Sequence, residues 1–256
     1  MLRKHVMDSK EIAPDGFRWR GNEPSRVEGF SDAVFAFAIT LLVVSLEVPK
    51  TFDELLTTMR GFAAFGVCFL LLYTLWHEHY IYFRRYGLHD RATIWLNALL
   101  LFVMLFFVYP LKFLFGLGIN AMVGIDTRVL LASGQIVDPI GPGQWQPLMM
   151  IYGGGYVAVY AVFAWMYTRA FKSGEALNLN PLETWLTRMS LVTHLTNVGI
   201  GLLVVMVAFV LHESAGLAGF LFFLIGPARF VVEGVKHRGM RELRPTSAVL
   251  QPGADS

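Results

Sequence analysis

Long apolar runs recur along this chain of 256 residues, and they constrain its fold more than any other feature. A helix needs about 20 mostly apolar residues to cross a lipid bilayer. By that measure the sequence predicts six spans, at residues 30–48, 55–83, 92–117, 148–171, 185–211 and 215–232. Charged residues make up only 16% of the chain, against roughly 25% in soluble domains. The expected fold class is therefore an all-α membrane protein with six transmembrane helices per subunit.

Basic residues lie beside alternate apolar runs. Lys and Arg are concentrated before the first run, after the second, after the fourth and after the sixth. Because cytoplasmic segments of membrane proteins are enriched in these residues, we expect both termini to be cytoplasmic. The predicted organisation is a cytoplasmic N-terminal arm (1–25), a six-span domain (26–235) and a cytoplasmic, largely disordered tail (236–256). The Gly- and Pro-rich connection at 118–147 is expected to form a cap outside the bilayer.

Several classes of function are disfavoured by the sequence. The net charge of +2 is too small to indicate a nucleic-acid partner. The single cysteine, Cys68, lies in an apolar run and forms no disulfide within the chain. The sequence contains no phosphate-binding loop, no HExxH motif and no nucleophile elbow, so neither an enzyme nor a cofactor is expected. His77 and His79 are about 200° apart on a helix and cannot share a metal ion.

The first apolar run contains a carboxylate, Asp32, two residues after its start. Ionisable side chains inside a membrane are costly, and they usually face the protein interior and have a partner there. The second run ends in Trp76, His77, Glu78 and His79, which lie at a similar predicted depth. We therefore expect a hydrogen-bonded cluster between these two helices. The simpler alternative is that Asp32 only stabilises the first turns of its helix, where acidic residues are favoured.

One side of the first helix carries a mostly apolar stripe. At about 100° per residue, the stripe comprises Ala33, Phe37, Thr40, Leu41 and Val44. Asp32 points away from it. Such a stripe most often faces lipid or a protein core. If several copies met around an axis, however, it would line a narrow apolar conduit with one ring of Thr40 oxygens. Apolar constrictions gate by dewetting, whereas rings of oxygen atoms stabilise a cation that loses its water.

The motif R-x-x-x-F-S-D is formed here by Arg26, Phe30, Ser31 and Asp32, and AVFAFAITLLVVSLEVP follows it. This stretch resembles the signature of the transmembrane protein 175 family, which are potassium-permeable channels of lysosomes and of bacteria. Trp76 and His79, in the spacing W-x-x-H, are also similar to the family. The single copy of the motif resembles the bacterial members, which assemble as homotetramers.

The resemblance implies a homotetramer in the bacterial inner membrane, with four first helices around a central pore. It implies a passive leak channel that prefers potassium among monovalent cations and is surrounded by membrane lipids. The pore-lining residues it implies are Phe37, Thr40, Leu41 and Val44. The residues it assigns to helix packing are Arg26, Phe30, Ser31, Asp32, Trp76, His77 and His79. Phe37 departs from the family pattern, in which an aliphatic residue is more usual at this position.

A proton-coupled secondary transporter that uses Asp32, His77 and His79 as a relay is the alternative. Such a carrier is expected to contain internal repeats and broken helices at the membrane midplane, which the sequence does not show.

Two further features concern helix packing. The three glycines at 153–155 are expected to let a neighbouring helix approach closely, and His194 is interpreted as an interhelical hydrogen-bonding residue.

Overall fold

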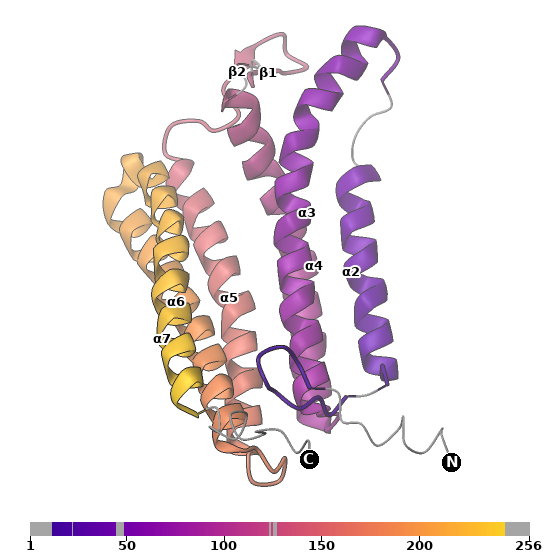
Figure 1. The fold of residues 1–256 in the computed structure, drawn as a ribbon. Helices are drawn as coiled ribbons and strands as arrows, with labels where there is room; N and C mark the ends of the chain where they lie inside the picture. Colours follow the sequence, from indigo (N-terminus) through magenta and orange to yellow (C-terminus); the bar gives the residue numbers. More distant parts are fainter. Residues whose placement is uncertain (1–11, 22, 45–48, 123, 125–126, 244–256) are drawn as a thin grey trace, which may run out of the picture.

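The computed structural model describes residues 12–21, 23–44, 49–122, 124 and 127–243 (Figure 1). Long helices that run side by side make up most of these residues: α2 (Arg26–Val44), α3 (Phe52–Tyr86), α4 (Arg91–Met122), α5 (Trp145–Lys172), α6 (Pro181–Leu211) and α7 (Ile225–Leu243). A 3-10 helix, η1 (His212–Leu224), joins α6 to α7. In the connection between α4 and α5, strand β1 (Val129–Leu130) pairs antiparallel with β2 (Ile136–Val137). The expectation of a predominantly helical chain is confirmed.

The described residues of the predicted spans all fall on helices. The first five correspond to α2–α6, and the sixth, at 215–232, falls on η1 and the start of α7. Among the described residues, three segments are long and apolar enough to cross a membrane, at 91–119, 145–172 and 181–243. The number of six spans therefore stays a prediction. Residues 45–48, at the end of the first predicted span, lie outside the described residues.

Two glycines let α5 pack closely against α6 and α4. A Cβ atom added to Gly153 of α5 would lie 2.6 Å from Cγ2 of Val205 on α6. A Cβ atom added to Gly155 would overlap the ring of Phe107 on α4. At both positions a larger residue would force the side chain of Val205 or Phe107 to move, so glycine favours the close approach of α5 to α6 and α4. This agrees with the expectation for Gly153 and Gly155, which are small residues of the kind that membrane helices use to approach closely, whereas nothing lies within 4 Å of a Cβ atom added to Gly154.

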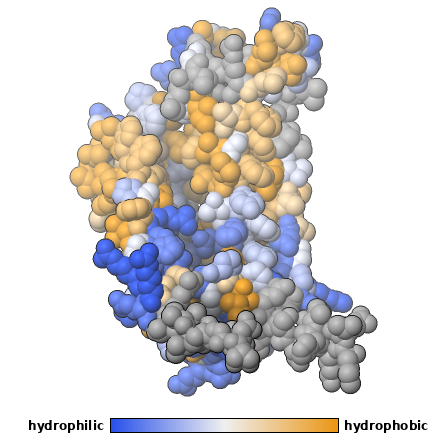
Figure 2. Space-filling view, viewed as in Figure 1, coloured by the Kyte–Doolittle hydropathy of each residue, from blue (hydrophilic) through white to orange (hydrophobic). Residues whose placement is uncertain are grey.

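Polar and apolar residues separate along the long axis of the subunit. Figure 2 shows hydrophilic residues gathered toward the end where α2 begins and α7 ends, hydrophobic residues over most of the upper part of this face, and further hydrophilic residues at its upper edge. The N-terminal arm lies at the hydrophilic end, where Pro14 and Met240 of α7 line a common cavity. The described ends of the chain therefore lie at the same end of the subunit. The first part of the tail that was predicted to be largely disordered (236–256) is helical as far as Leu243. Residues 244–256 lie outside the described residues.

The described part of the N-terminal arm, residues 12–21, forms a strap across the ends of the helices. Ile12 and Arg18 form an antiparallel bridge, and the side chain of Phe17 is completely buried. The backbone amides of Arg20 and Gly21 both donate to the carbonyl oxygen of Arg84 on α3. The strap is therefore an integral part of the folded subunit.

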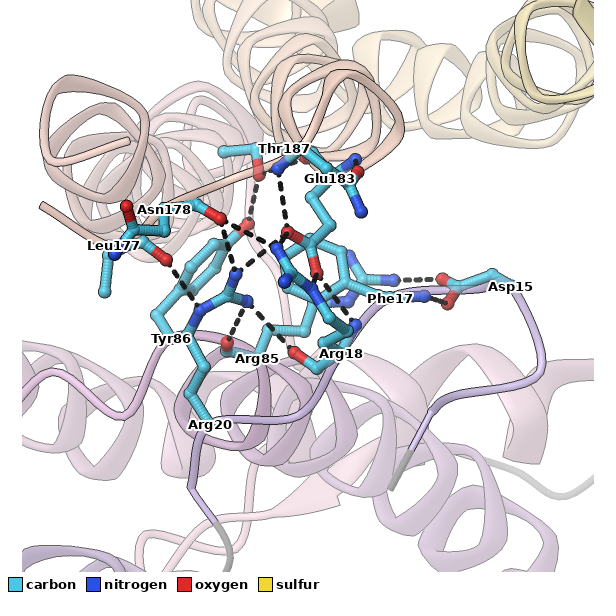
Figure 3. Close-up of polar contacts among 11 residues, drawn as sticks. Asp15, Phe17, Arg18, Arg20, Arg85, Tyr86, Leu177, Asn178, Glu183 and Thr187 are labelled. Carbon is cyan, nitrogen blue, oxygen red and sulfur yellow. Dashed lines mark hydrogen bonds and ion pairs between the residues drawn. The ribbon is translucent and has the colours of Figure 1, made fainter. Parts of the chain in front are cut away.

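A single buried carboxylate fastens the strap to α6 (Figure 3). Nε and Nη2 of Arg18 donate to the two oxygens of Glu183, at 2.9 and 2.7 Å, and Nη2 of Arg20 donates at 2.8 Å. Glu183 has no exposed surface, and it also forms the capping box of α6 with Asn180. Charge-assisted, bidentate bonds of this kind are stronger than hydrogen bonds between neutral groups. The segment directly before α2 is thus anchored to the start of α6.

We predict that Glu183→Gln lowers the free energy of unfolding by about 2 kcal/mol, because it removes the buried carboxylate charge that binds two guanidinium groups, which are themselves 33% and 18% exposed. Denaturant titration of the protein in detergent micelles measures this change. Glu175→Gln is the matched control, since Glu175 is an exposed carboxylate in the turn between α5 and α6. Equal losses in the two variants would contradict the anchoring role of Glu183.

Candidate functional site

Helix α2 packs against the rest of the subunit through one face only. Its buried residues recur every three or four positions: Glu28, Ser31, Phe35, Ala38 and Leu42. At about 100° per residue, these positions fall on a single side of the helix. Phe35, Ala38 and Leu42 share a core with residues of α3 and α4, among them Leu72 and Met104. The neighbours of α2 within the subunit therefore cover only this side.

The opposite side of α2 is uncovered by the described residues. Phe30 is 64% exposed and Phe37 is 57% exposed, and Ala33 and Thr40 are exposed beside them. These positions lie roughly opposite Phe35 and Ala38. Another chain could therefore approach this face without displacing α3 or α4.

Thr40 presents an acceptor oxygen on the uncovered face. Its hydroxyl donates to the carbonyl oxygen of Ala36 at 2.9 Å, so the hydrogen is held along the helix. The lone pairs of the hydroxyl oxygen stay available to an electropositive ligand. Leu41 is half-buried at the edge of the face. The side chain of Val44, the fourth predicted pore residue, lies outside the described residues.

Two hydrogen-bonded contacts fix α2 against α3 and α4, and we call them the clamp. In the first, Nε1 of Trp76 on α3 donates to Oδ1 of Asp32 at 2.7 Å. The carboxylate predicted to need a partner thus has one on the second helix. Asp32 flanks the uncovered face and is itself exposed in the single subunit.

The second contact of the clamp passes through three helices. A ring nitrogen of His79 lies 2.8 Å from Oδ1 of Asn97 on α4, and Nδ2 of Asn97 donates to Oγ of Ser31 at 2.9 Å. The Ser31 hydroxyl donates in turn to the carbonyl oxygen of Val27 at 2.8 Å. Ser31, His79 and Asn97 are all buried. Sequence reasoning missed Asn97, although an amide inside the apolar run TIWLNALLL is a recognisable signal for contact between helices.

Three of the predicted packing residues do not join the clamp. His77 is exposed, and its ring lies beside Tyr73 and Tyr80 on the surface of α3. Arg26 is exposed, and it forms no hydrogen bond or ion pair with the described residues. Phe30, at 64% exposure, belongs to the uncovered face rather than to the packed one.

The interpretation of His194 as an interhelical hydrogen-bonding residue is wrong for the described part of the chain. Both ring nitrogens of His194 are buried without a hydrogen-bond partner there, and the ring stacks on Phe163 at 5.2 Å. The hydrogen bond between α5 and α6 is made instead by Asn197, whose Oδ1 accepts from the Tyr156 hydroxyl at 2.7 Å. The His194 ring packs among aromatic side chains, and its Nε2 lies 4.0 Å from Oε2 of Glu78 on α3, beyond hydrogen-bond distance.

A row of aromatic rings on α3 extends the uncovered surface beside α2. Phe69, Tyr73, Trp76 and Tyr80 contact one another in sequence, with ring centroids 5.5–6.3 Å apart. Phe69 and Tyr73 are 36% and 48% exposed. Trp76 connects this row to Asp32 through the clamp. The uncovered surface of the subunit therefore spans one face of α2 and the adjoining face of α3.

Comparison with known proteins gives this arrangement a context. Residues 26–107, which contain α2, α3 and the first half of α4, match the family model described as endosomal/lysosomal potassium channel TMEM175. A protein of Marivirga tractuosa named potassium channel is 37% identical over 231 residues, which cover 89% of this chain and 93% of that relative. The chain belongs to the TMEM175 family.

Further TMEM175-related proteins agree with this assignment. The crystal structure of the potassium channel MtTMEM175, determined as a threonine-to-alanine variant with a nanobody–MBP fusion, superimposes with a TM-score of 0.75. It is 36% identical, and the match covers 89% of this chain and 100% of that one. A protein of Streptomyces collinus named potassium channel is 39% identical over 95 residues, 35% of this chain and 46% of its own length. The family match on residues 26–107 contains every residue of the clamp.

We predict that Trp76→Phe lowers the free energy of unfolding by about 1 kcal/mol, because the variant keeps an aromatic ring but loses the donor to Asp32. Denaturant titration in detergent micelles measures the loss. Trp95→Phe is the control, since Trp95 is 73% exposed on α4 and forms no hydrogen bond with the described residues. A loss of the same size in Trp95→Phe would argue against a specific contribution of the Trp76–Asp32 bond.

Proposed function

We propose that the protein is a potassium-preferring channel in which four copies of α2 surround a central, mostly apolar pore. The observation that carries this proposal is the uncovered face of α2, opposite its packed face, with Phe37 and the Thr40 oxygen exposed on it. Membership of the TMEM175 family supports it, because the relatives described above are named potassium channels. In a homotetramer this face would be the one turned to the axis.

The geometry of Thr40 suits a cation rather than an anion. In a four-fold arrangement, the Thr40 hydroxyls would present a ring of oxygens whose hydrogens are already bonded to Ala36 carbonyls. Such a ring replaces part of the hydration shell of a monovalent cation. Binding would be weak enough for release, since each hydroxyl carries no net charge. Selectivity for potassium over other monovalent cations would therefore be modest.

Phe37 would form the apolar constriction of this pore. It precedes Thr40 by three residues, or about 4.5 Å along the helix axis, on the side nearer the N-terminal arm. Its ring is 57% exposed in the single subunit, so α3 and α4 leave it available to line the axis. A ring of phenyl groups at a narrow point favours dewetting, which makes the constriction a barrier to ions. Conduction would then be passive, with Phe37 setting its rate.

In this proposal the clamp sets the rotation of α2 about its own axis. A shift of one residue turns the helix by about 100°, which would replace Thr40 with an apolar neighbour at the pore. The Trp76–Asp32 and Asn97–Ser31 bonds oppose such a turn from two different helices. Asp32 would thus act as a packing residue and not as an ion ligand.

The transporter alternative lacks the relay that it needs. Asp32 bonds to Trp76, His79 bonds to Asn97, and His77 is exposed on the surface of α3. A direct proton relay would use hydrogen bonds between these three groups, and none is found among the described residues. The observed contacts therefore favour a channel.

We also propose that the channel lies in the inner membrane of a bacterium with both termini in the cytoplasm, in contact with membrane lipids. The strap and the end of α7 lie at one end of the subunit (Figure 1), where basic residues such as Arg84, Arg169 and Lys236 also gather. Cytoplasmic segments are rich in such residues. Six spans per subunit would bring both ends to this side.

We predict that Thr40→Ala reduces the permeability ratio of potassium to sodium about fivefold, because one oxygen ring contributes roughly 1 kcal/mol to discrimination. Reversal potentials of the purified protein in planar bilayers measure this ratio. Thr74→Ala is a matched control, since Thr74 lies on α3 and its hydroxyl bonds to the Leu70 carbonyl in the same way. Saturable flux that requires proton antiport, or an unchanged ratio in Thr40→Ala, would refute the proposed pore.

We predict that Phe37→Ala increases potassium conductance about tenfold, because removal of the ring widens the constriction and lowers the dewetting barrier by roughly 1.4 kcal/mol. Single-channel recording or liposome flux provides the measurement. Phe106→Ala on α4 is the control, because Phe106 is 68% exposed but lies away from α2. Equal conductance in Phe37→Ala and the unmodified protein would place the narrowest point elsewhere.

A further inference from the structure

A second polar site lies in the subunit, apart from α2. A cavity of about 670 Å³ is enclosed by the strap, α3, α5, α6 and α7, and no residue of α2 lines it. Its size is that of a small-molecule site. Arg229, Phe230 and Glu233 of α7 are 48–81% exposed at its edge, so the cavity opens on the α7 side of the subunit.

The polar atoms left without a partner are concentrated around this cavity. Four of its lining side chains carry buried nitrogen or oxygen atoms that have no hydrogen-bond partner among the described residues: Trp19, Arg85, Tyr167 and His194. Tyr167 and His194 are at most 1% exposed. Nε2 of His194 lies 4.0 Å from Oε2 of Glu78, which also lines the cavity, so the ring is directed toward it. Buried polar groups without a partner are rare and call for an explanation.

These groups identify the chemistry of a ligand. Nε1 of Trp19 and Nε of Arg85 can only donate hydrogen bonds, and the Tyr167 hydroxyl and the neutral His194 ring can each donate one. A ligand that matches them must be rich in acceptor oxygens. A ligand that presents only donors, such as an ammonium group, would leave Trp19 and Arg85 without a partner, because both nitrogens can only donate.

The charged side chains that line the cavity form three pairs, so the lining carries no excess negative charge. Each lining carboxylate already faces a cation: Asp15 faces Arg85 at 2.5 Å, Glu233 faces Lys236 at 2.9 Å and Glu78 faces Arg229 at 3.3 Å. The Glu78–Arg229 pair is the longest of the three. Arg229 uses only Nη2 in its hydrogen bond to Glu78 within the described residues, so its other nitrogens are available to a second acceptor. Guanidinium groups bind phosphate through two parallel hydrogen bonds.

We propose that this cavity binds a phosphate group, held by Arg229 and Lys236 at its opening and by the buried donors of Trp19, Tyr167 and His194 within. The phosphate would belong either to an anionic phospholipid or to a small soluble anion. Basic pockets between membrane helices on the cytoplasmic side are known to suit lipid headgroups, and the exposed ring of Phe230 beside the opening would contact an acyl chain.

The position of the cavity connects it to the clamp. One turn of α3 contributes residues to both the clamp and the cavity. Trp76 and His79 contact α2 and α4, and the two residues between them, His77 and Glu78, line the cavity. A ligand that displaces Glu78 from Arg229 would therefore act on the helical turn that holds α2. The phosphate site is in this way a modulatory site outside the conduction path.

The binding test uses the purified full-length protein in nanodiscs and does not depend on ion conduction, so its outcome is separate from that of the proposed pore. In one series, the nanodiscs contain phosphatidylcholine only, and inorganic phosphate is titrated against chloride at constant ionic strength. In the other series, phosphatidylglycerol replaces part of the phosphatidylcholine. The melting temperature is measured throughout, because a ligand that binds only the folded state raises it.

We expect the melting temperature to rise by several degrees in at least one series. Arg229→Gln and Lys236→Gln should each raise the half-saturating phosphate concentration about tenfold or remove the phosphatidylglycerol effect, as expected for one lost charge-assisted bond. The double variant Glu78→Gln/Arg229→Gln should behave like Arg229→Gln, which excludes an effect of the unpaired carboxylate. Arg238→Gln is the control, since Arg238 is exposed on α7 but does not line the cavity.

The outcomes separate the two sources and can overturn the proposal. A response to inorganic phosphate in phosphatidylcholine alone identifies a soluble anion, and a response only to phosphatidylglycerol identifies a lipid headgroup. No stabilisation in either series would overturn the proposal. Equal responses of the Arg229→Gln, Lys236→Gln and Arg238→Gln variants would overturn it as well, because the cations at the opening would then have no specific role.

Discussion

The one-sided packing of α2 is the constraint on which the rest of the structure depends. Apolar side chains alone fix the rotation of a membrane helix only weakly, since lipid and the protein interior are similarly apolar. Here Phe35, Ala38 and Leu42 are buried on one side, and Phe37 and Thr40 are left on the other. Hydrophobic packing alone distinguishes these faces weakly. The polar contacts of the clamp supply the orientation, because hydrogen bonds fail when α2 turns by one residue.

Helix α3 connects α2 to the rest of the subunit. It is the longest described helix, and its last turns bind α2 through Trp76, α4 through His79 and the strap through the Arg84 carbonyl. Tyr86 continues the connection, because its hydroxyl donates to Thr187 of α6 at 2.9 Å. Helix α3 therefore links α2, α4, α6 and the strap at the hydrophilic end of the subunit. This link gives the proposed phosphate site on the α7 side a structural connection to the proposed pore, which it does not touch.

The sequence predicts the features that depend on local periodicity and depth. The faces of α2 follow from its helical repeat, and the meeting of Asp32 with Trp76 follows from their similar depth in neighbouring spans. Features that depend on helix rotation could not be predicted in the same way. His77 and His79 are two residues apart, yet one is exposed and the other buried, because Leu72 and Tyr82 fix which side of α3 faces inward. Arg18 and Glu183 are 165 positions apart, and no local pattern indicates that they meet.

The strap adds a restraint at one end of α2 that the clamp alone does not provide. Gly21 is bonded to Arg84, and α2 begins five residues later at Arg26, so the connection between them is short. At the far end, Nζ of Lys112 on α4 donates to the carbonyl oxygen of Leu42 at 3.3 Å. Helix α2 is therefore held near both ends and at the clamp, while the face that carries Phe37 and Thr40 takes no part in any of these contacts. Within a subunit, the residues that hold the helix and the residues proposed to meet the ion are thus separate sets. Substitutions on the uncovered face can accordingly alter conduction without weakening the fold of the single chain.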